Sequence, residues 1–317
     1  MAVFDLDPIA RAFERFISDL GSVGWGYLAA ALVLSLALQL CRARAWSNTL
    51  RAAYPDSGFR DREITAAFLI GTGLNGILPA KGGDAVKVVL AKRSVPRSSY
   101  PAIISSFAVL APFDSAAGFL VLLYAITQGL LPRLPQIPEL PAFEISFWAA
   151  HPEFLILTLT VLGIGLIALF IVLARRVEGF WARLRQGVAI MREPRRYLRE
   201  VLAWQAAGWV CRFASFWLFL DAFHIGGSAE TVLLVMSVQA IAGALPFTPG
   251  GVGAQQALLV ATLSGPSRSA VLAYSVGQQA AVTVWSVLVA AASLVFVFRT
   301  RDWRGLMREG REARDPA

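Results

Sequence analysis

Residues 245–256 read Leu-Pro-Phe-Thr-Pro-Gly-Gly-Val-Gly-Ala-Gln-Gln and interrupt an apolar run that is otherwise typical of a membrane helix. Pro246 and Pro249 lack backbone donors, and a proline also restricts the residue before it. The glycines of the stretch, which permit left-handed or closely packed backbone, are Gly250, Gly251 and Gly253. We therefore expect one helix to end near Leu245 and a second to begin near Ala254.

A similar interruption lies far upstream, where residues 75–84 read Asn-Gly-Ile-Leu-Pro-Ala-Lys-Gly-Gly-Asp, with the break at Pro79, Gly82 and Gly83. Each interruption follows an apolar helix and precedes a second, amphipathic segment. Broken backbone at membrane depth is stable only where protein or a water-filled cavity satisfies its polar groups. Paired interruptions of this kind in two halves of a membrane protein indicate a binding site between repeats.

The composition predicts an all-α polytopic membrane protein. Of 317 residues, 56% are hydrophobic and 16% charged, and the mean hydropathy is +0.60. The net charge of +8 comes from arginines between apolar runs and in the tail, which is the pattern of a positive-inside bias rather than of nucleic-acid binding. The two cysteines suit neither a zinc site nor a disulfide framework, and we expect no metal and no cofactor.

The first third of the chain alternates between apolar runs and arginine-rich segments. Residues 1–22 carry an apolar helical stripe and predict an interfacial amphipathic helix. Residues 25–41 predict the first membrane span, and residues 42–63 a cytoplasmic segment. The next apolar run, 64–78, gives roughly 22 Å of helix against a hydrocarbon core of about 30 Å. We therefore expect residues 64–93 to form a first re-entrant hairpin that returns to the cytoplasmic face.

The middle of the chain predicts further crossings. Residues 100–131 form either one long helix kinked at Pro112 or two joined half-helices. The proline-rich residues 132–153 predict an extracytoplasmic loop, and residues 154–174 predict a span. Residues 175–200 hold eight arginines and predict a cytoplasmic basic segment.

The last third sets the orientation of the second interruption. Residues 201–220 predict a span that ends outside, and residues 270–298 a span that ends inside. The tail, 299–317, holds six arginines and should be cytoplasmic. Residues 231–264 must then begin and end outside, and each half is too short to cross. We expect a second re-entrant hairpin there, opposite to the first, so that residues 1–317 form one inverted-repeat helical domain.

Two ionisable residues, Asp114 and Arg212, fall deep within predicted membrane segments. Ionisable groups cost about 2.5–3.5 kcal/mol at such positions and usually face a partner or a cavity. The two side chains either pair with each other and join two helices, or line a polar path for a lipid head group. The pattern alone leaves both alternatives open.

The first interruption carries Lys81, Asp84 and Lys87, and every lysine of the chain lies between residues 81 and 92. Lysines beside the free N–H groups at the start of a helix can bind a phosphate, although an ordinary helix cap explains them equally well. Uncharged polar candidates near the meeting point of the two interruptions are Asn75, Thr248, Gln255 and Gln256. They satisfy broken backbone or contact substrate, and the sequence does not separate these roles.

Catalytic motifs are scarce. The two histidines, His151 and His224, lie near predicted external ends, and the chain contains no Gly-x-Ser-x-Gly, Walker A or metal-ligand pair. We therefore predict no catalytic residue, and a pump driven by ATP within this chain is excluded.

The two interruptions carry signatures of a known family. Its first, Pro-Ala-Arg-x-Gly-Glu-x-x-Arg, is matched by residues 79–87 with lysine for both arginines and aspartate for glutamate. Its second, Pro-x-x-Pro-Gly-Gly-x-Gly-x-x-Glu, is matched by residues 246–256 with Gln256 in place of the acid. Its third, Glu-Arg-x-x-Asp, keeps Asp114. The chain thus resembles the lysylphosphatidylglycerol synthase/flippase transmembrane family, and its lysines are similar to those of the branch associated with hopanoid biosynthesis.

The resemblance implies a lipid translocator of the bacterial inner membrane, multi-pass with a cytoplasmic C-terminus, which moves a phospholipid or a hopanoid or isoprenoid lipid. The missing acid at Gln256 argues against proton coupling there. Two other hypotheses stay open: a membrane-embedded transferase that uses Asp84 and Asp114, and a scaffold for lipid-biosynthetic enzymes. Expected partners are the lipid and those enzymes, not nucleic acid, and a homo-oligomer is left open.

Overall fold

The computed structural model describes residues 21, 23–78, 82–127, 178–244, 253–263 and 266–298, and every regular element within these ranges is helical. The α-helices are α2 (Trp25–Ala53), α3 (Asp61–Asn75), α4 (Gly82–Ser94), α5 (Tyr100–Phe107), α6 (Ala111–Thr127), α9 (Glu178–Gly187), α10 (Pro194–Tyr197), α11 (Ala203–Ala222), α12 (Ala229–Ala244), α13 (Ala254–Thr262) and α14 (Arg268–Ser293). Short 3₁₀ or π elements are η1 (Pro55–Ser57), η3 (Ala189–Arg192), η4 (Leu198–Leu202) and η6 (Leu294–Phe298).

Three helical stretches of the described chain are long and apolar enough to cross a membrane: Trp25–Ala53, Tyr100–Val121 and Arg268–Phe298. At 1.5 Å per residue, Trp25–Ala53 and Arg268–Phe298 each exceed the hydrocarbon core of about 30 Å. The prediction of an all-α membrane protein is confirmed. The predicted interfacial helix (1–22), the span 154–174, the tail 299–317 and the centres of both interruptions lie outside the described residues, apart from Gly21.

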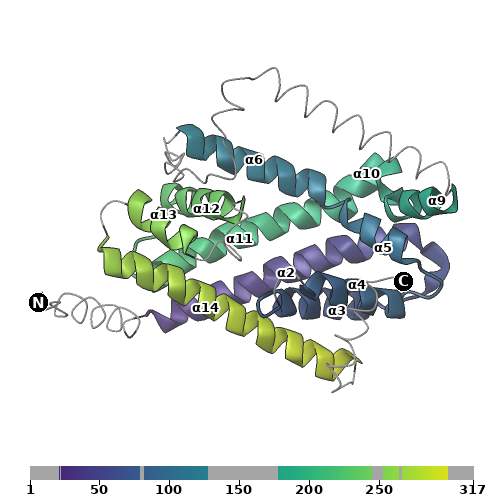
Figure 1. Ribbon diagram of the computed structural model, residues 1–317, viewed down its shortest axis with the longest axis horizontal. Coiled ribbons are helices and arrows are strands. Elements are labelled where there is room, and N and C mark those ends of the chain that lie inside the picture. Colours follow the sequence, from purple (N-terminus) through teal and green to yellow (C-terminus); the bar gives the residue numbers. More distant parts are fainter. Residues whose placement is uncertain are drawn as a thin grey trace, which may run out of the picture.

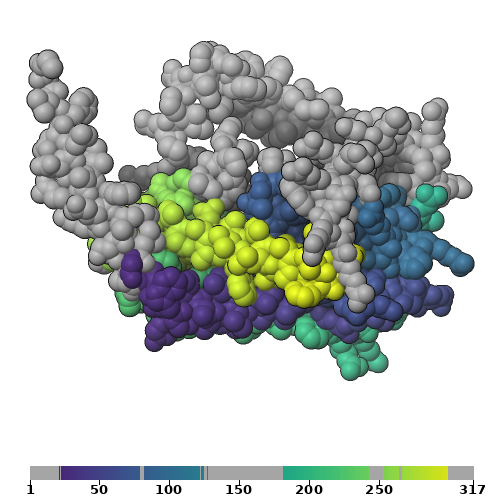
Figure 2. All heavy atoms as spheres, turned by 90° about the horizontal axis from the view of Figure 1, so that it is seen from below, coloured from purple at the N-terminus to yellow at the C-terminus, as the bar shows by residue number. Residues whose placement is uncertain are grey.

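Helices α2 and α11 form the antiparallel centre of the molecule. Gly24 donates its N–H to the carbonyl of Ala222 at one end (2.8 Å), and the Asn48 amide donates to the Glu200 carbonyl towards the other (2.7 Å). Helix α2 runs beyond the predicted end of the span at Cys41, because the residues after it are buried in the core rather than solvated. Trp46 is fully buried there. Figure 2 shows α14 alongside α2 on the face seen from below.

The first interruption separates two packed antiparallel helices, α3 and α4. A Cβ on Gly71 would lie 2.6 Å from the Gly83 carbonyl oxygen, and one on Gly83 would collide with the backbone of Gly71 and Asn75. The glycines therefore allow the two helices to touch through their backbones. Helix α3 begins and ends slightly before the predicted run 64–78.

The second interruption has the predicted helix boundaries, since α12 ends at Ala244 and α13 begins at Ala254. Gly253 has a φ of +86°, a conformation that favours glycine. Figure 1 shows the α12–α13 pair and the α3–α4 pair towards opposite ends of the long axis of the molecule. This placement agrees with hairpins that enter from opposite faces, but re-entry into a membrane stays a prediction.

The described part of the run, 100–127, contains two helices rather than one kinked helix. Helix α5 ends at Phe107 and α6 begins at Ala111, and a turn at residues 108–110 joins them. Pro112 lies in the first turn of α6, where its missing N–H leaves no helical bond unmade.

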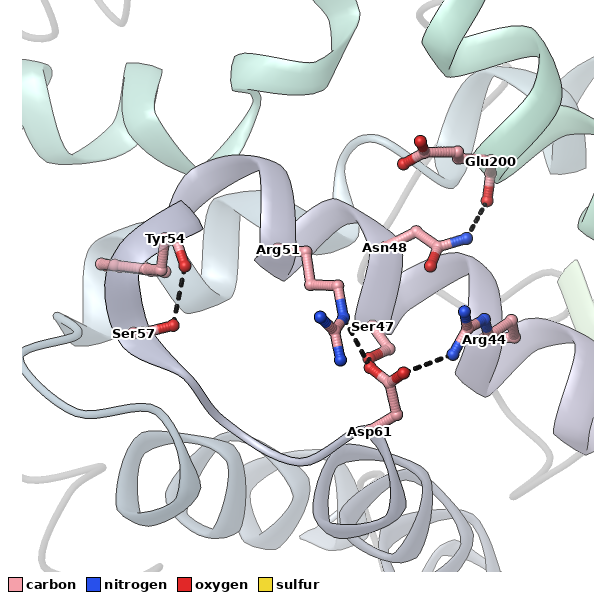
Figure 3. A network of polar contacts seen from close by, with 8 residues as sticks. All are labelled: Arg44, Ser47, Asn48, Arg51, Tyr54, Ser57, Asp61 and Glu200. Atoms are coloured by element: carbon pink, nitrogen blue, oxygen red, sulfur yellow. Dashed lines mark hydrogen bonds and ion pairs between the residues drawn. The ribbon is translucent and has the colours of Figure 1, made fainter.

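One end of the bundle gathers the arginines of α2 and those of residues 178–200, the described part of the basic segment. There Asp61, the first residue of α3, accepts hydrogen bonds from Arg44, from Ser47 (2.6 Å) and from Arg51 (2.8 Å), as Figure 3 shows. Burial raises the pKa of Asp61, but the bonds from Arg51, Ser47 and Arg44 outweigh it and lower the pKa to about 2. These hydrogen bonds hold the first residue of α3 against the second half of α2.

Candidate functional site: a chain of polar cavities

A cavity of about 390 Å³ lies among α2, α3, α11, α12, α13 and α14, and we call it the glutamine cavity. It is lined by residues of both helix pairs that flank the interruptions. Its polar lining consists of Ser35, Gln39, Thr72, Arg212, Ser215, Gln239, Gln255, Gln278, Gln279, Thr283, Trp285 and Ser286. Arg212 is the one charged residue among the described residues that line it. Polar groups at this density within apolar helices indicate a site for a polar ligand.

Four of these glutamines were not among the predicted site residues: Gln39, Gln239, Gln278 and Gln279. Each lies in a long apolar helix, where an uncharged amide is costly unless hydrogen-bonded. That signal is present in the sequence, but the uncharged candidates predicted from it all lie beside the two interruptions. Gln255, which was predicted, lines the cavity and is buried.

Gln256 bridges the second interruption and the cavity wall. Its Oε1 accepts from the backbone N–H of Gly253 at 2.6 Å, and its Nε2 donates to Oε1 of Gln279 at 3.3 Å. Gln256 therefore satisfies backbone at the interruption and positions Gln279, and it is not itself among the cavity-lining residues. Of the two roles that the sequence left open for Gln256, the geometry supports the first.

Arg212 and Asp114 do not pair with each other. The carboxylate of Asp114 instead pairs with Arg42 at 2.7 Å and accepts a weaker bond from Trp209 Nε1 at 3.4 Å. Arg212 lies 5.2 Å from the Trp209 ring centre and 5.8 Å from that of Phe216, and none of the ion pairs in the described part of the chain includes it. The structure therefore does not contain the Arg212–Asp114 ion pair that was one of the two predicted alternatives.

A second, more open cavity of about 780 Å³ contains two ion pairs, and we call it the ion-pair cavity. Besides Arg42 and Asp114, its lining includes Asp84 and Lys87. Lys87 donates to Asp84 Oδ1 at 2.9 Å, and the amide of Asn75 donates to the same oxygen at 3.0 Å. The side chain of Lys87 is 8% exposed and that of Asp84 is 49% exposed, so the lysine is buried behind its acid.

Aromatic rings enclose the Lys87 ammonium group. Its Nζ lies 4.3 Å from the ring centre of Phe68 and 5.5 Å from that of Phe107. A cation over aromatic faces is stabilised by the ring quadrupole, and this matters most where water is excluded. The predicted residues Asn75, Asp84 and Lys87 are thus brought together as one hydrogen-bonded group.

A connecting cavity of about 300 Å³ lies between the other two. It shares Arg42 and Asp114 with the ion-pair cavity, and Arg212 and Ala240 with the glutamine cavity. Arg42, Asp114 and Arg212 together carry one net positive charge. The three cavities therefore adjoin one another at these side chains.

Several predicted residues fall outside the described parts of the chain: Lys81, Thr248, Pro79, Pro246, Pro249, Gly250 and Gly251. Gly82 and Gly83 open α4, and Gly253 precedes α13. Arg42 is a site residue that the sequence analysis missed, because it placed residues 42–63 in a solvated segment. The continuation of α2 beyond Cys41 is what carries Arg42 to Asp114.

Comparison with known proteins gives one family. The model of the lysylphosphatidylglycerol synthase TM region matches residues 9–291, which is most of the chain and includes every residue of the three cavities. No curated protein and no solved structure matches the chain.

Proposed function

The chain belongs to the family of the lysylphosphatidylglycerol synthase transmembrane region, a group of lipid-related membrane proteins, and we propose that it is a lipid translocator. The lipid is polar-headed, either a phospholipid or a hopanoid or isoprenoid lipid. The membrane is the bacterial inner membrane. The arginine-rich end of the bundle faces the cytoplasm, as the positive-inside rule requires, and the C-terminus lies on the same side.

The glutamine cavity is the observation that carries this proposal. A lipid head group must cross a region where each unsatisfied polar group costs several kcal/mol, so a translocator has to offer hydrogen bonds in place of water. The cavity offers amides and hydroxyls from six helices around one arginine. Its volume, at the lower end of the usual range for ligand sites, suits a head group whose hydrocarbon tails stay in the bilayer.

In this mechanism the head group follows the chain of cavities. Its anionic group first meets Arg42 and Lys87, whose own acids, Asp114 and Asp84, keep the entrance near neutral. It then passes to Arg212, which has aromatic neighbours and no carboxylate partner in the described chain. Asp114 discriminates between head groups, because it repels a second negative charge and attracts a cationic one.

The test is translocation of a fluorescent phospholipid in vesicles that contain the purified full-length protein. We expect Arg212→Gln to reduce the rate by about tenfold or more, because a charge-assisted bond to the head group is lost. Arg192→Gln, at an exposed arginine outside the cavities, is the matched control and should leave the rate unchanged. Equal rates for wild type, Arg212→Gln and protein-free vesicles would refute the proposal.

A membrane-embedded transferase is a second candidate, because Asp84 and Asp114 line the same ion-pair cavity. Mass spectrometry of lipids from cells that express the protein separates the two functions. A new lipid that disappears with Asp114→Asn would favour the transferase. Translocation without any change of lipid mass favours the translocator.

A further inference from the structure

The two cysteines of the chain, Cys41 on α2 and Cys211 on α11, lie opposite each other although they are far apart in the sequence. Contacts towards both ends of this antiparallel helix pair fix its register, among them the 2.9 Å hydrogen bond between Ser35 and Ser215. In that register Cys41 lies beside the turn of α11 formed by residues 208–211. Helix packing thus pairs two residues that the sequence gave no reason to pair.

The helices approach each other closely at this level because position 208 is a glycine. A Cβ on Gly208 would lie 3.5 Å from the Cβ of Cys41, and Cys211 is the next residue on the same face of α11. The thiol groups of Cys41 and Cys211 are within hydrogen-bonding range of each other. Two thiols in contact meet the first requirement of a disulfide bond, whose Cβ atoms are about 3.5–4.5 Å apart.

Each cysteine directly precedes an arginine that lines the connecting cavity. Arg42 follows Cys41, and Arg212 follows Cys211. Neither cysteine lines any of the three cavities itself. A covalent bond between the cysteines would therefore leave the cavities open, but it would fix the separation of the two helix backbones beside the residues that carry their cations.

We propose that Cys41 and Cys211 are a redox site: they form a reversible disulfide that locks α2 to α11 beside the two cavity arginines and slows translocation. Formation of the disulfide does not depend on the proposed translocator function, whereas its effect on translocation rests on that function. Both cysteines are partly exposed, so a small oxidant can reach them.

Hydrogen peroxide is an oxidant of the required kind, because it is small and uncharged. The sulfur of one cysteine attacks a peroxide oxygen and the O–O bond breaks, which gives a sulfenic acid and one water. The second sulfur attacks the sulfenic sulfur; the S–S bond forms, the S–O bond breaks, and the hydroxyl group leaves with the proton of the second thiol as another water. The two sulfurs lose two electrons, which the peroxide gains. A dithiol reverses the reaction by thiol–disulfide exchange.

The first step should be slow, because apolar surroundings disfavour the thiolate. The second should be fast, because the partner thiol is already held beside the sulfenic acid. A stable sulfenic acid or an adduct with an external thiol should therefore not accumulate.

Oxidation of the purified full-length protein in detergent, with copper phenanthroline or hydrogen peroxide, tests the pair directly. Alkylation under denaturing conditions and peptide mass spectrometry should find the Cys41–Cys211 disulfide in most chains, and dithiothreitol should remove it. The melting temperature should rise by several degrees on oxidation, because a cross-link between distant residues constrains the unfolded chain. Two free cysteines after oxidation, or disulfides only between two copies of the chain, would overturn the proposal.

The double substitution Cys211→Ser with Val210→Cys is the matched control. It keeps two cysteines but moves one thiol by about 100° around α11, to a position where Val210 is 69% exposed. This variant should form no disulfide within the chain and should show no change of melting temperature on oxidation. Cross-linking as complete as in wild type would mean that the native pairing is not specific, and the proposal would be wrong.

Translocation of the fluorescent phospholipid in vesicles separates the redox site from the proposed function. Oxidation should slow wild type by about fivefold or more, because a covalent bond prevents α2 and α11 from sliding past each other, and dithiothreitol should restore the rate. Cys41→Ser should keep its rate under the same treatment. A disulfide that leaves the rate unchanged rejects the lock and retains the translocator. A disulfide in protein that translocates nothing, reduced or oxidised, retains the redox site and rejects the translocator.

Discussion

Asp114 on α6 and Arg42 on α2 form an ion pair, with 2.7 Å between Oδ2 and Nη2, although 72 residues separate them in the sequence. The other carboxylate oxygen accepts from Trp209 on α11. One side chain thus joins three helices where the ion-pair cavity meets the connecting cavity. The stability of the fold should depend on it, and so should passage of a head group under the proposed function.

We expect Asp114→Asn to lower the free energy of unfolding by roughly 1–2 kcal/mol, because both partners are about one-third exposed and the pair lies between the buried and surface cases. A double-mutant cycle with Arg42→Gln, measured by denaturation in detergent, should give a coupling of about 1 kcal/mol. The same cycle at the more exposed Glu193–Arg196 pair, with Glu193→Gln and Arg196→Gln, should give almost no coupling energy. Strict additivity of the Asp114 and Arg42 substitutions would show that the pair contributes nothing.

The Asp61 cluster predicts a pH dependence of stability. Burial raises the pKa of Asp61, but the bonds from Arg51, Ser47 and Arg44 lower it to about 2, below the value of 3.8 for a free carboxyl group. Its stabilising effect is therefore complete above about pH 4 and is lost as the pH falls through about 2. Asp61→Asn should lower the melting temperature at pH 7 and reduce the change in melting temperature between pH 5 and pH 2. Parallel pH profiles of wild type and variant would contradict this assignment.

The close contact between α3 and α4 predicts that Gly83 does not tolerate a larger side chain. Gly83→Ala should destabilise the protein by roughly 1–3 kcal/mol, because the new methyl group meets backbone that cannot rotate away. Gly26→Ala, within α2 and with nothing near its Cβ position, is the matched control and should be neutral or slightly stabilising. Chemical denaturation measures both. A neutral Gly83→Ala would mean that the helices separate easily at this point.

Removing Asp84 and removing Lys87 should cost different amounts of stability. Asp84→Asn leaves the buried ammonium group without its carboxylate, whereas Lys87→Met leaves an acid that is half exposed to water. Removal of the exposed partner should therefore cost more stability than removal of the buried one, by about 1 kcal/mol or more. Thermal melts of the two variants, with Lys87→Arg as the conservative comparison, provide the measurement. The reverse order would indicate that Lys87 is hydrated.

The local signals in the sequence predicted the helix boundaries at the two interruptions, but not the end of α2. Proline and glycine end helices through effects on their own backbone, so the boundaries around residues 245–253 follow from the residues at those positions. Local sequence patterns also predicted the span at α14 and the break between α3 and α4. For the run at 100–131 they left two alternatives, and the structure has two helices, α5 and α6.

The partners of the polar side chains could not be predicted in the same way. The approach of Arg42 to Asp114 depends on α2 continuing as a helix beyond Cys41, which the burial of Trp46 stabilises and no local pattern reveals. The glutamines of the cavity are far apart in sequence and gather only because six helices pack around them. Such a constellation is a product of tertiary structure.

The hydrogen bonds from Gly253 through Gln256 to Gln279 couple two parts of the molecule mechanically. Because one side-chain amide makes both bonds, loss of the Gln256 side chain would leave the Gly253 N–H and the Gln279 carbonyl oxygen without these partners at the same time. A substitution at position 256 would therefore alter the start of α13 and the wall of the glutamine cavity together.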